Sequence, residues 1–192
     1  MIQSISGILK DKSAGGAVVE VGGVGLCLFV SERDLAALPP LGENVSLHSH
    51  LHVREDAFEL YGFTNKAGLD FFKLLIGVSG VGPKSALAVL SAAELEGLLA
   101  AIKEGRPDLL TKAPGIGRKT AERIILELRG KIKSPHSEEL VGGMERDADL
   151  LDMLVDLGYK RDQARAAIEK SGGEAEGFED RFRAALKILG KK

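Results

Sequence analysis

Two segments of the chain carry the residue types that can hold a phosphate group. They read GVGPKSA over residues 80–86 and GIGRKTA over residues 115–121. Both have the order glycine, apolar residue, glycine, one variable residue, lysine, hydroxyl residue, alanine, and they begin 35 positions apart. Glycines leave main-chain amides open to a ligand, and a lysine adds a positive charge. The repeat therefore predicts two matched sites for an anion.

A nucleotide-binding loop is one site that such residues can form. The phosphate-binding loop of ATPases places its lysine directly after the last glycine, so that the ammonium reaches the terminal phosphates. Here Pro83 separates Gly82 from Lys84 and turns the lysine by about 100° around a helix that starts at this point. An ATPase also needs an acidic strand to hold magnesium, and we identify no such strand in the sequence. This alternative predicts that the purified chain binds nucleotide by itself.

Each repeat stands between two helical patterns and opens the second one. Residues 85–102 and 120–132 carry apolar residues at three- and four-residue spacing, which indicates helices. The free N–H groups and the positive dipole end at the start of a helix favour an anion. Pro83 suits this position, because the first helical residue needs no N–H donor. The arrangement of helix, tight turn and helix matches the helix-hairpin-helix motif, which grips the DNA backbone without reading bases.

An ordinary turn between packed helices is the alternative to a binding site. It explains the glycines, but it does not explain a lysine at the same place in both copies. We expect Lys84 and Lys119 to supply positive charge, and we expect Val81 and Ile116 to plug each turn into the core between the helices.

The charge of the chain is unevenly distributed. Residues 1–63 hold 4 basic and 8 acidic residues, residues 64–134 hold 12 and 7, and residues 135–192 hold 10 and 13. The net charge of −2 thus hides a basic middle third between two acidic flanks. Because phosphate is anionic, only the middle third is an electrostatic candidate for nucleic acid.

The periodicity of the apolar residues predicts an α+β protein with several domains. Residues 1–63 read as about five short strands with one helical patch, which favours a five-stranded β-barrel of the OB type. Residues 64–133 form an all-α domain with the tandem helix-hairpin-helix motifs. Residues 134–145 mix Pro, Ser, Gly and acids without periodicity and are predicted to be a flexible linker. Residues 146–192 hold three short helices, enough for a small UBA-like domain.

The single cysteine and the N-terminus bear on the cellular compartment. Cys27 lies in the apolar run GLCLFV and has no partner for an internal disulfide, so we expect a buried thiol in a reducing compartment. The N-terminus lacks a basic segment followed by an apolar one, and no run approaches about 20 apolar residues. We therefore expect a cytoplasmic protein without membrane contact.

Three histidines alternate along one predicted strand. His48, His50 and His52 would share one face at a spacing of about 6.8 Å. A metal site there is an alternative that we set aside, because no carboxylate or cysteine at ligand spacing joins them. We expect no metal and no cofactor, and we find no Ser-His-Asp or Cys-His arrangement with a supporting local signature.

Three segments together resemble the RuvA family, the Holliday-junction-binding subunits of the bacterial RuvAB branch-migration complex. They are VREDAFELYGF over residues 53–63 and the two hairpin segments over residues 77–90 and 111–125. The resemblance implies sequence-independent binding of four-way DNA junctions in recombination and repair. It further implies a non-catalytic homotetramer that recruits the hexameric ATPase RuvB, with the resolvase RuvC as a further partner through the shared junction. Whether one tetramer or two facing tetramers hold the junction stays open.

The resemblance also implies which residues contact DNA phosphates. In the family, the basic helix-hairpin-helix face lies against the arms of the junction. Carried over by motif, the DNA-binding residues are Ser79, Gly80, Gly82, Lys84, Gly115, Gly117, Arg118, Lys119, Thr120 and Arg123. Because Arg123 follows Lys119 by four positions, we expect both side chains along one helix face.

Two acids stand at a predicted hairpin tip. Glu55 and Asp56 lie between the strand patterns LHSHLHV and AFELYGF, and acids in such a turn are usually just solvated. The resemblance implies instead an acidic pin at the centre of the tetramer, which repels the crossing strands. A carboxylate and a phosphate about 6 Å apart in water repel by about 0.7 kcal/mol.

The C-terminal domain is acidic, which argues against DNA contact. Its first helix carries more apolar residues than a small core can cover, and this surplus suggests a protein partner. Burial of these residues in the domain's own core is the alternative. The resemblance implies RuvB as the partner, and the expected contact residues are Leu150, Leu154, Leu157, Tyr159, Leu186 and Leu189.

A barrel that binds single strands is a third function to consider, because many OB folds do so. It calls for aromatic residues stacked along a basic groove. Residues 1–63 are net negative, and their aromatic residues are Phe29, Phe58, Tyr61 and Phe63. We therefore rank single-strand binding below junction binding.

Overall fold

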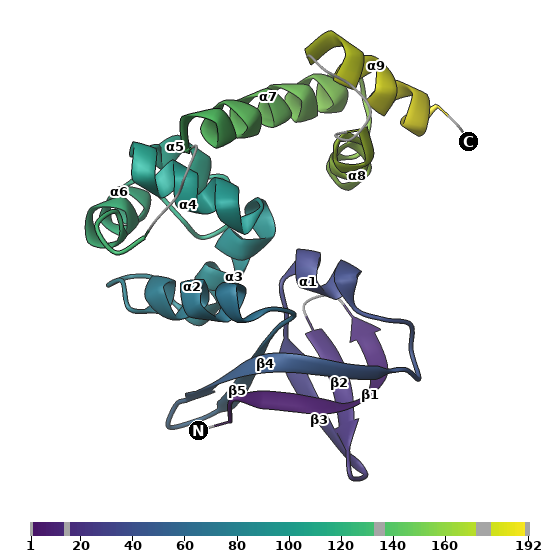
Figure 1. The fold of residues 1–192 in the computed structure, drawn as a ribbon, viewed down its shortest axis with the longest axis vertical. Coiled ribbons are helices and arrows are strands. Elements are labelled where there is room, and N and C mark those ends of the chain that lie inside the picture. The colour runs from purple at the N-terminus through teal and green to yellow at the C-terminus, as the bar shows by residue number, and fades with distance from the viewer. Residues whose placement is uncertain (1, 14–15, 133–136, 172–177, 191–192) are drawn as a thin grey trace. The chain divides into compact units, whose positions relative to one another are not determined.

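The computed structural model describes residues 2–13, 16–132, 137–171 and 178–190. The chain divides into two compact units, Met1–Pro135 and His136–Lys192. The first unit contains a β-barrel followed by helices, and the second contains helices (Figure 1). The predicted α+β class is confirmed.

Five strands form a closed barrel in the order β1-β2-β3-β5-β4. Their bounds are β1 Ser4–Ser13, β2 Gly16–Val21, β3 Val24–Phe29, β4 Asn44–Val53 and β5 Phe58–Phe63. Neighbouring strands are antiparallel except β3 and β5, which run parallel. Helix α1, Glu32–Ala37, lies in the connection between β3 and β4. The strands and the helical patch of the predicted OB-type barrel are thus present.

Every second side chain along the strands points into the barrel, and these side chains fill its interior. Leu9, Val19, Leu28 and Leu47 are fully buried in its interior. Because successive side chains of a strand point to opposite faces, the neighbour of an interior residue points outward. Cys27 directly precedes Leu28 and is exposed. The prediction of a buried thiol is therefore wrong, because the apolar run GLCLFV is a strand with one outer face.

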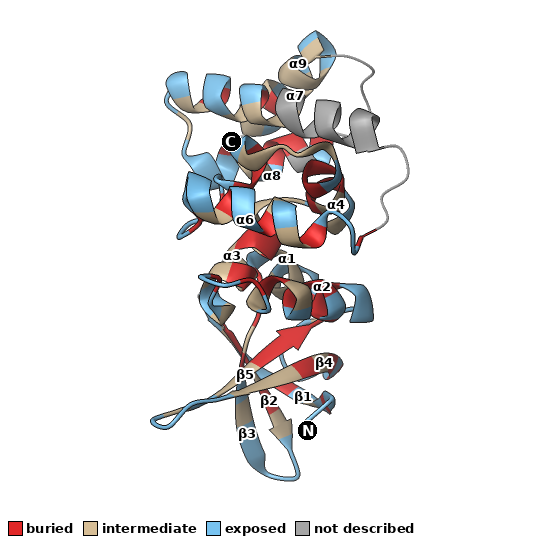
Figure 2. Cartoon of the chain, turned by 90° about the vertical axis from the view of Figure 1, so that its left-hand side faces the viewer, coloured by how far each residue is buried: buried red, intermediate tan, exposed pale blue. Residues whose placement is uncertain are grey.

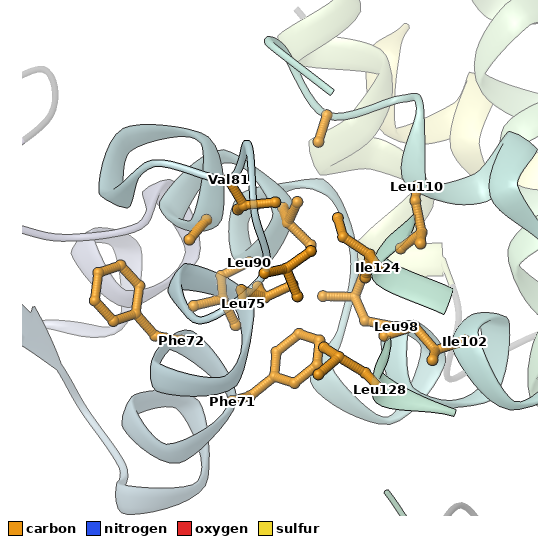
Figure 3. Packing of buried hydrophobic residues seen from close by; sticks show 14 of the residues in the cluster. Phe71, Phe72, Leu75, Val81, Leu90, Leu98, Ile102, Leu110, Ile124 and Leu128 are labelled. Atoms are coloured by element: carbon orange, nitrogen blue, oxygen red, sulfur yellow. The ribbon is translucent and has the colours of Figure 1, made fainter. Parts of the chain in front are cut away.

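The rest of the first unit is helical, as the three- and four-residue periodicity predicts. Its helices are α2 Lys66–Ile76, α3 Pro83–Ala92, α4 Leu95–Glu104, α5 Pro107–Leu110 and α6 Arg118–Leu128. They share one core, in which Phe72, Leu75, Leu98 and Ile124 are fully buried (Figure 3). Within the described ranges, no single helix is long and apolar enough to cross a membrane; α3 and α4 meet that criterion only jointly, as a pair bent by 100°.

The barrel packs directly against helix α2. Tyr61 and Phe63 at the end of β5 belong to the helical core, and their ring centroids lie 5.2 and 5.0 Å from that of Phe72. The ring of His50 on β4 meets the same Phe72 edge-on at 5.6 Å. Strand β5 therefore serves both the barrel and the helices, and this shared packing sets the position of the barrel relative to α2.

Helix α1 adds polar contacts between the barrel and the helices. The N–H of Glu32 donates to Oγ of Ser91 in α3 at 3.1 Å. Arg33 pairs with Glu94, which stands just before α4. Because these partners are far apart in sequence, the contacts fix the barrel to the segment that follows the first hairpin.

The second unit consists of α7 Ser137–Asp156, α8 Arg161–Ser171 and α9 Phe178–Leu189. Its core is built from Leu150, Leu154, Ala164, Ala167, Ile168 and Ala185. The flexible linker predicted over residues 134–145 is wrong from Ser137 onward, since α7 begins there; residues 134–136 lie outside the described residues. Each of the two glycines in α7 costs the helix about 1 kcal/mol. Because the downstream part of α7 is packed in the core, the helix is nucleated there and extends through these glycines.

Candidate nucleic-acid interface

The two sequence repeats form the same turn. Gly80 and Gly115 occupy the left-handed region, with φ of 87° and 80°. Gly82 and Gly117 are extended, with φ/ψ of −81°/166° and −82°/168°, and they are the N-caps of α3 and α6. The left-handed values favour glycine, because a Cβ would clash with the backbone. The repeat of the sequence is therefore also a repeat of backbone conformation.

Main-chain hydrogen bonds hold the two turns in the same way. In the first hairpin, the N–H of Val81 donates to the carbonyl of Val78 at 3.0 Å. In the second, the N–H of Ile116 donates to the carbonyl of Ala113 at 3.1 Å. The side chains of Val81 and Ile116 are buried in the helical core, as predicted; Figure 3 shows Val81 there. These two plugs anchor the turns, so the outer backbone of each hairpin stays at the surface.

The helix starts that follow the turns are open. A Cβ placed on Gly82 or on Gly117 would meet no atom within 4 Å. Neither glycine can cap its helix with a side chain, so the first-turn N–H groups of α3 and α6 receive no cap of this kind. Such groups, together with the helix dipole, attract an anion. The geometry thus provides two accessible anion-binding turns in one unit.

The hairpins also contact each other crosswise. Nη1 of Arg123 in α6 donates to the carbonyl oxygen of Ser79 in the first hairpin at 3.0 Å. A Cβ on Gly115 in the second hairpin would lie 3.2 Å from Oγ of Ser85 in α3. Arg123 thus links α6 to the first hairpin, and its place on the Lys119 face of α6 stays a prediction. Helical spacing alone does not reveal this long-range partner.

The predicted cations have different surroundings. Lys84 is exposed, but its Nζ lies 4.0 Å from Oε1 of Glu59 and 5.6 Å from the ring centroid of Phe29. Arg118 pairs with Glu122 one turn later, at 3.0 Å from Nε to Oε1. Lys119 is exposed, and it makes no ion pair with any residue in the described part of the chain. The second hairpin thus presents an uncommitted ammonium.

The hydroxyl residues occupy the rims of the two turns. Ser79 is exposed, and Thr120 in the first turn of α6 is half-buried. Ser79 directly precedes Gly80, and Thr120 is in α6, whose N-cap is Gly117. The structure therefore brings the ten predicted residues together on the two turns and the helices α3 and α6.

Glu59 is a charged neighbour that the sequence analysis did not single out. Its Oε2 accepts a hydrogen bond from the hydroxyl of Tyr61 at 2.9 Å, while Oε1 faces Lys84. Burial, followed by the hydrogen bond and charge of Glu59, raises the pKa of Tyr61 above its ordinary value. The alternation in FELYGF places Glu59 and Tyr61 on one strand face, but no local pattern predicts contact with Lys84.

The acids Glu55 and Asp56 lie at the tip of the β4–β5 hairpin, where the sequence predicts them. The tip is exposed and projects beyond the strands (Figure 2). Arg54 holds Asp56 through two hydrogen bonds of 3.2 and 3.1 Å, from Nε and Nη2. Glu55 makes no ion pair with any residue of the described ranges. One of the two carboxylates is thus partly neutralised by its neighbour.

The alternating histidines pack against a helix. His50 contacts Phe72, and its ring centroid lies 6.5 Å from that of His52. Burial, together with the positive charges of His52 and Lys73, lowers the pKa of His50. In the described part of the chain, no group of three or more His, Cys, Asp or Glu residues is arranged to hold a metal ion.

The predicted partner surface of the second unit is largely internal. Leu150 and Leu154 are fully buried in the core, so their assignment to an exposed contact surface is wrong. Tyr159, Leu186 and Leu189 are half-buried and pack against the same core. Leu157 is 59% exposed. The sequence could not tell the buried residues from the half-buried and exposed ones, because burial depends on how α7, α8 and α9 pack against one another.

Two family models match this chain. The model described as the RuvA N terminal domain matches residues 1–62. The model described as the SAM-like Helix-hairpin-helix tandem matches residues 72–131. These ranges coincide with the barrel and with the helices that carry both hairpins.

Curated proteins match over the full length. A protein of Herpetosiphon aurantiacus is 42% identical over 195 residues, with 99% of each chain covered. One of Chloroflexus aurantiacus is 43% identical over 193 residues, again with 99% of each covered. One of Caldanaerobacter subterraneus is 39% identical over 195 residues and covers 100% of both. Each is named Holliday junction branch migration complex subunit RuvA, and at this identity and coverage the chain belongs to the RuvA family.

Proposed function

We propose that this chain binds four-way DNA junctions through their phosphates, without reading base sequence, and holds them open for branch migration. The observation that carries this proposal is the pair of conformationally matched hairpins, each with an open helix start. Two such turns in one compact unit can bind two points of a sugar–phosphate backbone. The names of the full-length relatives point to the same substrate.

The grip combines main-chain and side-chain donors. Main-chain N–H groups at the turns of Gly80–Gly82 and Gly115–Gly117 donate hydrogen bonds to the phosphate oxygens, and Lys119 and Arg118 add positive charge at the second hairpin. Ser79 and Thr120 lie at the rims and can donate hydroxyl hydrogen bonds. None of these groups reads a base edge, so binding is independent of sequence.

The exposed acids supply the preference for a junction. Glu55 and Asp56 project from the barrel, and a phosphate near them is repelled by about 0.7 kcal/mol per charge at about 6 Å. In a homotetramer the tips of several subunits would meet at the crossover, so their repulsion adds up. Continuous duplex across the centre is disfavoured, whereas an open junction keeps its strands apart.

The second unit is the site for a protein partner, the ATPase RuvB. Its acidic composition argues against phosphate as a partner, and Met153 near the end of α7 and Leu157 just after it are 42% and 59% exposed. The chain itself is then a non-catalytic, cytoplasmic subunit whose partner hydrolyses ATP. RuvC meets the complex through the shared junction.

A direct binding comparison tests the proposal. Fluorescence anisotropy with a four-way junction, a linear duplex and a single strand of equal length should rank the junction first. The logarithm of affinity should fall with the logarithm of salt concentration by about 0.9 per phosphate contact. A slope near zero, or equal affinity for all three DNAs, contradicts the proposal. ATP hydrolysis by the purified chain alone would favour the ATPase alternative.

A further inference from the structure

The last residue pair of the β4–β5 ladder is apolar and exposed. Val53 and Phe58 are cross-strand partners, and they are 55% and 79% exposed. The turn from Arg54 to Ala57 joins them and is closed by a hydrogen bond from the Arg54 N–H to the Ala57 carbonyl at 2.9 Å. Both acids of the tip lie in this turn. An exposed aromatic ring is therefore the first side chain after the acidic turn.

Strand alternation accounts for the apolar type of this pair but not for its exposure. Leu60 lies on the same strand face as Phe58 and packs against the barrel core. The residues that pair β3 with β5 begin at Leu60, and those that pair β1 with β4 end at His48. The β4–β5 ribbon thus extends beyond its neighbouring strands (Figure 2). The core face of the ribbon therefore continues, uncovered, to Val53 and Phe58.

Phe58 differs from the other aromatic residues of the barrel. Tyr61 and Phe63 are fully buried, and Phe29 is half-buried. Among the described residues, Phe58 belongs to no hydrophobic cluster and contacts no other ring. Its ring is thus not used by the fold and is available to a ligand.

The charge and the area of the patch favour an uncharged, flat ligand. The carboxylates of Glu55 and Asp56 repel phosphate from its surroundings. A stable protein interface buries about 800 Å² on each partner. A phenylalanine side chain buries only about 150–250 Å², so Phe58 and Val53 fall well short of that area. The face of a nucleobase is uncharged and flat, and it stacks on an aromatic ring whatever the base.

An open four-way junction presents such faces at its centre. Arms that are held apart no longer stack on one another, so the last base pair of each arm exposes one face at the crossover. A continuous duplex exposes no such face along its length. A stacking residue beside the acidic turn would therefore favour the open junction.

We propose that Phe58 stacks on the base pairs that an open junction exposes at its crossover, with Val53 as the apolar support of the ring. The neighbouring acids keep phosphates away, while the ring replaces part of the stacking that the arms lose. This inference rests on the proposed binding of an open junction. It adds a contact with base faces to a site otherwise built for phosphates.

Abasic nucleotides at the crossover of a synthetic four-way junction test this contact in the full-length protein. In anisotropy titrations, Phe58→Ala should weaken binding to the intact junction by about fivefold or more, as expected for a lost base–aromatic stack. It should not weaken binding to the junction with the abasic crossover. Phe58→Leu should behave like Phe58→Ala, because it keeps apolar area without a ring, whereas Phe58→Tyr should retain wild-type affinity.

Val24→Ala is the matched control. Val24 is 59% exposed and belongs to the last pair of the β2–β3 ladder, so it is an apolar residue at a different hairpin of the same barrel. Its substitution should leave the affinities for both junctions unchanged.

Tryptophan fluorescence gives a second measurement, because the chain contains no tryptophan. The indole introduced by Phe58→Trp should be quenched when the intact junction binds, as expected for a ring stacked on a base. Its emission should be retained when the junction with the abasic crossover binds.

Three results overturn the inference. The first is an equal loss of affinity in Phe58→Ala for the intact and the abasic junction. The second is an unquenched indole in the complex of Phe58→Trp with the intact junction. The third is a smaller oligomer of Phe58→Ala in analytical ultracentrifugation, which would assign the pair to a contact between copies of this chain. Equal affinity of the wild-type protein for junction and duplex would instead contradict the proposed function itself.

Discussion

The ammonium of Lys84 lies 4.0 Å from the carboxylate of Glu59, so the first hairpin is electrostatically tied to the barrel. Glu59 is itself held by the hydroxyl of Tyr61 at 2.9 Å. Lys84, which the sequence repeat assigns to phosphate binding, therefore already interacts with the carboxylate of Glu59 in the absence of DNA.

Removal of this acid should strengthen DNA binding. Glu59→Gln keeps an acceptor for Tyr61 but removes the charge that competes for Lys84. Exposed ion pairs contribute about 0.2–1 kcal/mol, so affinity for junction DNA should rise by up to about fivefold. Anisotropy titrations measure the effect. In a Lys84→Ala background the same substitution should change little; an equal gain there would mean that Lys84 is not involved.

The glycines of each hairpin should separate folding from binding. Gly80→Ala forces an alanine to φ near 87° and should cost about 1–2 kcal/mol of unfolding free energy. Gly82→Ala is extended and unobstructed, so it should cost less than about 1 kcal/mol while it hinders a phosphate. Thermal melts and junction titrations measure both quantities. Equal loss of stability in the two variants would contradict the turn geometry.

The acids of the β4–β5 tip should act unequally. Arg54 partly neutralises Asp56, so Glu55→Gln should strengthen binding to plain duplex more than Asp56→Asn does. Arg54→Gln should weaken duplex binding, because it frees the second carboxylate. The ratio of junction affinity to duplex affinity is the measurement. An unchanged ratio in the Glu55→Gln, Asp56→Asn double variant would exclude a role of the tip in discrimination.

Phe72 should be a stability determinant of the first unit. It is fully buried between β5 and the helical core, and loss of a buried Phe side chain costs about 3–5 kcal/mol. Phe72→Ala should lower the free energy of unfolding by that amount in urea titrations. Phe58→Ala is the matched control, since Phe58 is 79% exposed and should change stability by less than about 0.5 kcal/mol.

Acid should destabilise the first unit through His50. Burial lowers the pKa of His50 in the folded protein below the ordinary value of about 6.5, so the unfolded chain binds the proton more readily. Stability is then fully present above about pH 6.5 and is lost as the pH falls from there toward the lower folded pKa. Tm at pH 7.5 and 5.5 should differ less in His50→Gln than in wild type. An identical pH response would assign the effect to other groups.

Much of this protein can be read from local sequence patterns. Alternation predicts the strands of the barrel, and three- and four-residue spacing predicts the helices that follow. The repeat of glycines around Val81 and Ile116 predicts both turns, because a left-handed backbone position and a plug into the core each demand one residue type. These are local requirements of the chain, so the sequence alone determines them.

The failures of prediction have one common cause. Cys27 reads as buried from its apolar neighbours, but strand alternation turns it outward. Leu150 and Leu154 read as surplus surface residues, yet they form the core of the second unit once α8 and α9 pack on α7. In each case the sequence gives the residue type. It does not give the residue's burial, because burial depends on which face of the helix or strand is covered.

The sequence by itself determined the two hairpins and their glycines, since turn and helix start are set within a few neighbouring residues. Only the tertiary structure decided which intramolecular partners the cations of the two hairpins meet. Arg123 meets Ser79 and Lys84 meets Glu59 through the packing of elements 44 and 25 residues apart, and no local pattern encodes an ion pair or hydrogen bond over such separations.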